Sequence, residues 1–121
     1  MVQVLGIGGV FFRAKDPAAL AQWYQTHLGI NLVPNAPDAT PWVTQAGVTI
    51  FAPFDQDTDY FPKDRAFMLN FRVADLAAAL VELEGAGITA SDTTYMDGVG
   101  QFARIHDPEG NPIELWQPAD P

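Results

Sequence analysis

The sequence contains no cysteine, few basic residues and no long apolar run, and each absence excludes a class of protein. Without cysteine, the chain forms no disulfide and offers no thiolate to a metal. Six Lys and Arg residues stand against 15 Asp and Glu, and the net charge of -9 argues against a surface for nucleic acid or anionic membrane, since these need cations. No stretch approaches the about 20 apolar residues of a membrane helix, and residues 1–9 lack the basic start of a signal peptide. We therefore expect a cytoplasmic protein that binds neither nucleic acid nor membrane.

The composition predicts one folded unit. The chain has 121 residues, of which 48% are hydrophobic, so it is neither disordered nor fibrous. A chain of this length buries roughly two-thirds of its unfolded surface and has room for a single core. We expect residues 1–121 to form a single domain.

The end of the chain predicts a β-hairpin. Residues 102–106 and 113–116 alternate in the manner of strands, and the turn residues Asp-Pro-Glu-Gly-Asn lie between them. Asp107 can accept backbone hydrogen bonds, and Gly110 can take a positive φ without strain. Glu114 is the unusual residue, because a carboxylate in so apolar a strand needs solvent, a partner or a metal. If its two neighbours face a core, Glu114 points to the opposite side.

The chain also contains an internal repeat. Phe-Arg-Ala-Lys-Asp at residues 12–16 matches Phe-Arg-Val-Ala-Asp at residues 71–75, and each Asp is a good N-cap for a helix. Each half reads strand, helix, strand, strand, strand. In the first half we expect strands over 2–14, 31–36, 42–44 and 48–52 and a helix from Pro17 to Gly29. In the second half we expect strands over 67–73, 88–91, 102–106 and 113–116, with a helix that Asp75 begins and Gly85 and Gly87 end.

These units divide the domain into a first module, a connector and a second module, over residues 1–52, 53–65 and 66–121. The connector is acidic, is bracketed by prolines and has no helical or strand period, so we interpret it as a solvated loop or lid.

This doubled pattern, together with the motif DPEGNPIEL at residues 107–115, resembles the vicinal oxygen chelate superfamily. That group holds glyoxalase I, bleomycin-resistance proteins, extradiol dioxygenases and fosfomycin-resistance enzymes, and the resemblance covers nearly the whole chain. It implies an α+β fold in which two βαβββ modules form a curved mixed sheet around a cleft. It also implies that two copies can pair as a homodimer.

The resemblance implies a divalent metal on the strands that face the cleft, and it assigns the ligand positions. These positions carry Gly9 and Met68 on the first strands of the modules, and Thr49 and Glu114 on the last strands. Only Glu114 is a donor suited to such an ion, whereas a zinc site usually has about three protein ligands. We therefore expect no metal cofactor. The alternative is a divalent metal bound through Glu114 with unusual partners.

Strand parity predicts the residues that line the cleft and bind a ligand. They are Phe11, Arg13, Phe51, Met68, Asn70, Arg72, Arg104 and Trp116. Aromatic walls with a few polar groups suit an apolar or aromatic small molecule. Arg13 and Arg72 occupy equivalent repeat positions, where they either anchor an anion or form ion pairs at the strand ends. Glu114 either acts as a general base, binds a cationic group of a ligand, or pairs with an arginine.

Two hypotheses on function follow. In the first, the protein resembles bleomycin-resistance proteins and binds an apolar or aromatic molecule in the cleft without a metal. In the second, it is an enzyme: a metal-dependent lyase, isomerase or dioxygenase, or a metal-free enzyme with Glu114 or His106 as catalytic residue. The lack of donors at three of the four ligand positions favours the first hypothesis.

Overall fold

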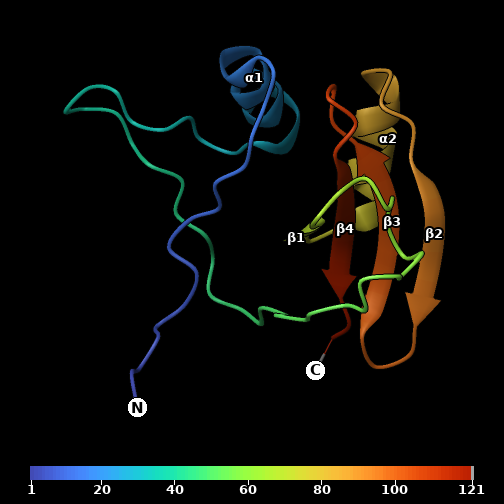
Figure 1. Ribbon diagram of the computed structural model, residues 1–121. Helices are drawn as coiled ribbons and strands as arrows, with labels where there is room; N and C mark the ends of the chain where they lie inside the picture. Colours follow the sequence, from blue (N-terminus) through green and yellow to red (C-terminus); the bar gives the residue numbers. More distant parts are fainter. Residues whose placement is uncertain (121) are drawn as a thin grey trace.

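A four-stranded sheet built from the second half of the chain forms the centre of the structure, a computed structural model that describes residues 1–120 (Figure 1). The strands are β1 (Leu69–Arg72), β2 (Ser91–Met96), β3 (Gly100–His106) and β4 (Pro112–Pro118), in the order β1-β4-β3-β2. β1 runs parallel to β4, whereas the other two pairs are antiparallel. The result is a mixed sheet that is open at both edges, and the fold class is α+β.

The β3–β4 hairpin forms as its sequence predicts. Asp107 accepts hydrogen bonds through Oδ1 from the backbone N–H groups of Glu109 and Asn111, at 2.9 and 3.0 Å. Gly110 has φ +82°, which lies in the left-handed region that favours glycine. The turn sets the register that places Ala103 opposite Leu115 and each residue of β3 opposite its partner in β4.

Both predicted helices form, α1 over Pro17–Leu28 and α2 over Leu76–Gly85. Their N-caps are Asp16 and Asp75, and each carboxylate accepts a hydrogen bond from the backbone N–H three residues further on, at 3.1 and 3.0 Å. Gly29 ends α1 in the left-handed conformation. In each repeat, therefore, the helix forms where the local sequence predicts it.

The core lies on one face of the sheet, the face that α2 covers from behind in Figure 1. It joins sheet residues to both helices: Leu20, Tyr24, Leu76, Leu83, Ala103, Ile105, Ile113 and Leu115. Because successive side chains of a strand point to opposite faces of the sheet, the residues between these core positions in β3 and β4 face the other side.

The hairpin turn also holds α1 against the second half of the chain. The Tyr24 hydroxyl donates a hydrogen bond of 2.7 Å to Asp107 Oδ2, and the backbone N–H groups of Lys15 and Asp16 donate to the Glu109 carboxylate at 2.7 and 3.0 Å. Burial, the hydrogen bond to Asp107 and the charge of that carboxylate all raise the pKa of Tyr24 beyond its usual range. The hydroxyl therefore remains a donor at any physiological pH.

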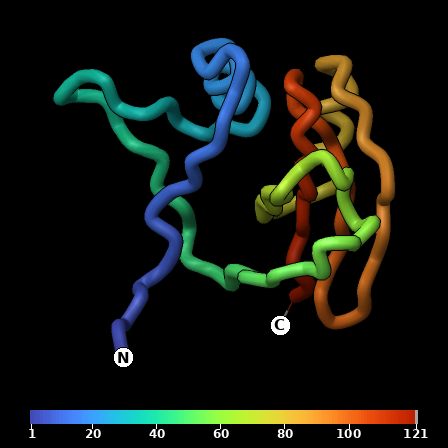
Figure 2. Tube along the Cα trace, viewed as in Figure 1, coloured from blue at the N-terminus to red at the C-terminus, as the bar shows by residue number. Residues whose placement is uncertain are grey.

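The predictions of strands over 2–14, 31–36, 42–44 and 48–52 were wrong for this structure. In the part of the chain that the structure describes, these segments lie outside the sheet without strand hydrogen bonds (Figures 1 and 2). The physical reason is that a strand needs a neighbouring strand to satisfy its backbone groups, and none lies beside them. The short strand predicted over 88–91 was also wrong, since β2 begins at Ser91, where pairing with β3 begins.

No helix within residues 1–120 combines the length and the apolar character that a membrane crossing requires.

Candidate functional site

Glu114 lies on the face of the sheet opposite the core, as the strand alternation predicts. Its neighbours Ile113 and Leu115 belong to the buried cluster under the helices, so its own side chain points the other way. The side chain is only 8% exposed. A carboxylate buried to this degree needs hydrogen-bond donors.

Two side chains supply those donors. Asn70 lies opposite Glu114 in the β1–β4 register and donates from Nδ2 to Oε1 at 2.8 Å. The Tyr60 hydroxyl donates to Oε2 from the connector, which crosses in front of the sheet on this face (Figure 1). Burial first, and then the hydrogen bond to and the charge of Glu114, raise the pKa of Tyr60 to about 12, so at neutral pH this phenol is a donor.

Arg104 completes the polar cluster. It lies opposite Glu114 in the β3–β4 register and is 9% exposed. Its Nη2 donates to the backbone carbonyl of Tyr60 at 2.8 Å, and its guanidinium carbon lies 5.4 Å from the centroid of the Tyr60 ring. Its Nε has no hydrogen-bond partner among residues 1–120, although it is buried. The site therefore contains one cationic donor that the protein leaves unsatisfied.

A pocket of about 620 Å³ lies between the sheet and the connector, and its walls include Tyr60, Phe61, Asp92, Arg104 and Glu114. A volume of this size suits a drug-sized molecule. The pocket combines a buried acceptor, a buried cation and two aromatic rings.

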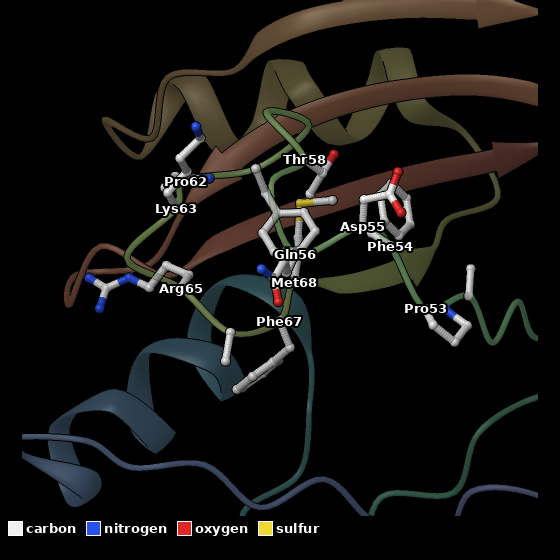
Figure 3. A pocket seen from close by; sticks show the side chains of 13 residues that line it. Pro53, Phe54, Asp55, Gln56, Thr58, Pro62, Lys63, Arg65, Phe67 and Met68 are labelled. Atoms are coloured by element: carbon white, nitrogen blue, oxygen red, sulfur yellow. The ribbon is translucent and has the colours of Figure 1, made fainter.

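A second pocket of about 460 Å³ lies beside the first, and Figure 3 shows its lining. The two share Phe61, Pro62 and Lys63 as wall residues, so the connector separates them. The second pocket holds Met68, one of the predicted ligand-binding residues, together with Phe67. The connector thus has a hollow on each side of it.

The structure brings together three of the predicted site residues, Asn70, Arg104 and Glu114. Arg72 and Trp116 lie on the same face, but their polar groups are used elsewhere. Arg72 donates to the carbonyls of Gln45 and Ala46 at 2.8 and 3.4 Å, and Trp116 donates to the carbonyl of Val99 at 2.9 Å while its ring stacks on Phe102.

The predicted residues of the first half do not line either pocket. Phe11, Arg13 and Phe51 are exposed, because the segments that carry them do not join the sheet. His106 is exposed at the end of β3, one residue before the hairpin turn.

Tyr60 is the site residue that sequence reasoning missed. The acidic residues around it indicated a solvated loop, and this interpretation passed over the aromatic pair formed by Tyr60 and Phe61. Two adjacent aromatic residues in an otherwise polar connector are a signal for contact with a buried surface.

The residues at the site do not fit a divalent metal. Residues 1–120 contain no group of three His, Asp or Glu side chains placed to hold an ion. The other implied ligand positions carry Gly9, Thr49 and Met68. The guanidinium of Arg104 opposite Glu114 would also repel a divalent cation.

The family model for the glyoxalase-like domain matches residues 9–116. The chain belongs to this family. It is therefore a member of the vicinal oxygen chelate superfamily, as the repeat and the DPEGNPIEL motif indicated. No curated protein matches the chain.

Solved structures agree with this assignment. An antibiotic-binding protein, TnmS3 from Streptomyces sp. CB03234, is 25% identical over 87% of this chain and 88% of its own, with a TM-score of 0.57. Two glyoxalase/bleomycin resistance/dioxygenase structures are each 18% identical. The one from Frankia sp. EAN1pec covers 97% of this chain and 100% of its own, with a TM-score of 0.60, and the one from Sphaerobacter thermophilus covers 86% and 90%, with a TM-score of 0.52. The latter two support the fold alone.

Proposed function

We propose that this glyoxalase-like protein binds a small apolar or aromatic molecule in the pocket in front of Glu114, without the metal site usual in its superfamily. The observation that carries the proposal is the buried carboxylate of Glu114 at an open pocket of about 620 Å³, where it accepts a hydrogen bond from a tyrosine of the connector. The similarity to TnmS3, which is an antibiotic-binding protein, supports binding as the activity.

The hydrogen bonds favour binding over catalysis by Glu114. Both of its oxygens already accept a donor, from Asn70 and Tyr60. A general base must face the proton that it removes, and here Asn70 and Tyr60 occupy one lone pair of each oxygen. A ligand that replaces one of these donors can bind without any proton transfer.

The donor set supports binding without a metal. At the implied ligand positions only Glu114 carries a carboxylate, and its neighbours are an amide, a phenol and a guanidinium. Metal analysis of protein purified without chelator should therefore find far less than one equivalent of any divalent metal. One equivalent that disappears in Glu114→Gln would contradict this part of the proposal.

A blocked pocket tests the binding function itself. Thr94 is an exposed residue of β2 that lines the pocket, and its neighbour Thr93 is exposed but does not line it. We expect a panel of naphthalene probes to bind the native protein, to bind Thr93→Trp equally well, and to lose at least ten-fold in affinity for Thr94→Trp. Isothermal titration calorimetry measures this. Equal binding to both variants would place any ligand site elsewhere.

We also propose that two copies pair as a homodimer, through residues 1–14 and 40–52, here called the open flank. The flank exposes many large apolar side chains, including Leu5, Ile7, Phe11, Ile50 and Phe51. The chain exposes 9366 Å², whereas a folded protein of 13.2 kDa exposes roughly 6,400 Å², so roughly 3,000 Å² is in excess. Doubled over two copies, this area is typical of permanent dimers, and a soluble monomer rarely exposes such patches.

Sedimentation tests the dimer. We expect a mass of about twice the 13.2 kDa of the chain. Ile50→Asp on the open flank should shift the mass towards the monomer, and Val81→Asp, at an exposed position of α2, should not. A monomer at all concentrations would contradict the pairing. We also propose a cytoplasmic location for the protein.

A further inference from the structure

We infer that the ligand presents an aromatic hydroxyl to Glu114 and Arg104, and that Tyr60 occupies this place until the ligand displaces it. This inference rests on the proposed binding function and names the chemical class of the ligand. It depends on three observations: what Tyr60 does in the pocket, what Arg104 lacks, and how the connector is attached.

Tyr60 shows which group the cluster accepts. Its phenol donates a hydrogen bond to Glu114, and its ring lies 5.4 Å from the guanidinium carbon of Arg104. Tyr60 comes from the connector and is itself partly exposed, so it is not locked in the core. The protein thus places a phenol of its own on the one buried carboxylate of the pocket.

Arg104 determines the second hydrogen bond that a ligand would make. Its buried Nε–H has no acceptor within the described residues, 1–120, and Arg104 lines the same pocket as Glu114. An acceptor supplied by a ligand would satisfy this donor. The complete partner of the cluster therefore donates to Glu114 and accepts from Arg104.

Among simple groups, a hydroxyl meets both demands. Its oxygen carries one donor and two lone pairs, whereas an ammonium only donates and an ether only accepts. The guanidinium of Arg104 lies opposite Glu114 and disfavours a second cation on this carboxylate, whereas Asp59 and Asp92 of the pocket wall are exposed to solvent, which screens their charges. The aromatic rings of Tyr60 and Phe61 in the wall favour an aromatic carrier of the hydroxyl.

The attachment of the connector makes displacement feasible. On this face Tyr60 is held through its hydroxyl and through its carbonyl, which accepts from Arg104 at 2.8 Å, and its ring stacks on Phe54 of the connector itself. When a ligand hydroxyl replaces the phenol, the ring of Tyr60 can move with Phe54 while the backbone contact remains. Tyr60 therefore competes with the ligand for Glu114.

Three matched probes test this inference by isothermal titration calorimetry at pH 7. They are 2-naphthol, which donates and accepts; 2-methoxynaphthalene, which only accepts; and 2-naphthylmethylammonium, which only donates. We expect 2-naphthol to bind the native protein at least five-fold more tightly than either of the others. Tyr60→Phe removes the competing hydroxyl and keeps the ring, so it should tighten 2-naphthol binding by roughly 3- to 10-fold.

Two further variants make the result specific. Glu114→Gln weakens the acceptor and should reduce the preference for 2-naphthol to less than two-fold. Tyr95→Phe removes an exposed hydroxyl on β2 that bonds to Asp97 outside the pocket, and it should change nothing. Circular dichroism of each variant confirms that it is folded.

The outcomes separate the inference from the proposed function. Probes that bind without preference for 2-naphthol, or that bind Tyr60→Phe more weakly, would overturn the hydroxyl inference and leave small-molecule binding in place. Tightest binding of the ammonium would assign Glu114 to a cation instead. If none of the probes binds the native protein or Tyr60→Phe, both the inference and the proposed function fail.

Discussion

The two halves of the chain carry the same sequence pattern, yet only their helices form in the same way. The motif at residues 12–16 repeats at 71–75, and in both halves its Asp caps a helix. The second half goes on to form a four-stranded sheet. The first half contributes α1 to the core of that sheet, while its remaining segments lie in the open flank and around it.

The difference shows which part of the pattern is local. A helix forms its backbone hydrogen bonds within its own turns, and a capping Asp accepts one more from the N–H three residues further on. A strand satisfies its backbone only through a neighbour. Residues 48–51 match 113–116 in pattern, but β4 lies between two strands and residues 48–51 have none beside them.

The largest effect should come from matched core positions of the two halves. Leu115 is 1% exposed and Ile50, its counterpart, is 67% exposed. Leu115→Ala should lower the free energy of unfolding by about 2–5 kcal/mol. Ile50→Ala should change the free energy of unfolding of the monomer by less than about 0.5 kcal/mol. It should instead raise the dissociation constant of the proposed dimer. Urea unfolding at several protein concentrations separates the two effects, and equal costs in dilute protein would contradict the comparison.

The second-largest effect should come from the β3–β4 hairpin turn, which has no counterpart in the described part of the first half. Asp107 is buried and accepts from the Tyr24 hydroxyl, from the Asn111 amide and from two backbone N–H groups. Asp107→Ala leaves several of these donors unsatisfied and should cost about 2–3 kcal/mol. Asp97→Ala, at the exposed β2–β3 turn, is the control and should cost far less. Thermal unfolding measures both, and similar shifts for the two variants would show that the buried turn has no special role.

The helix caps should give equal effects in the two halves. Asp16→Ala and Asp75→Ala each remove one bond to a backbone N–H, and each should cost about 1 kcal/mol. Chemical denaturation of the two variants checks this. If Asp16→Ala left the free energy of unfolding unchanged while Asp75→Ala lowered it by about 1 kcal/mol, α1 would not unfold together with the second half.

The smallest effect concerns the connector between the halves and appears only at high pH. The pKa of Tyr60 is raised to about 12 in the folded protein, from an ordinary value of 10. The stabilising contribution of the neutral phenol is therefore complete below pH 10 and is lost as the pH rises through 12. Tyr60→Phe should lose less stability than the native protein between these values, and Tyr95→Phe should behave as the native protein does. A parallel loss in Tyr60→Phe would show that the phenol is not coupled to Glu114.

The sequence predicts most of what is local and part of what is not. Caps, helix ends and the hairpin turn follow from residues such as Asp16, Gly29 and Asp107, whose roles involve neighbours only a few positions away. The orientation of Glu114 follows from simple alternation. The strands of the first half could not be judged in this way, because pairing depends on segments distant in sequence. Tyr60 was missed for the same reason, since its partner Glu114 lies 54 residues further on.

A nuclear magnetic resonance titration compares the two halves of the chain as ligand sites. Protein labelled with ¹⁵N is titrated with 2-naphthol, and the amide shifts are followed along the chain. We expect the largest changes at Tyr60, Asn70, Arg104 and Glu114, and none at Phe11 and Phe51. Changes centred on Phe11 and Phe51, with the amides around Glu114 unmoved, would contradict this expectation.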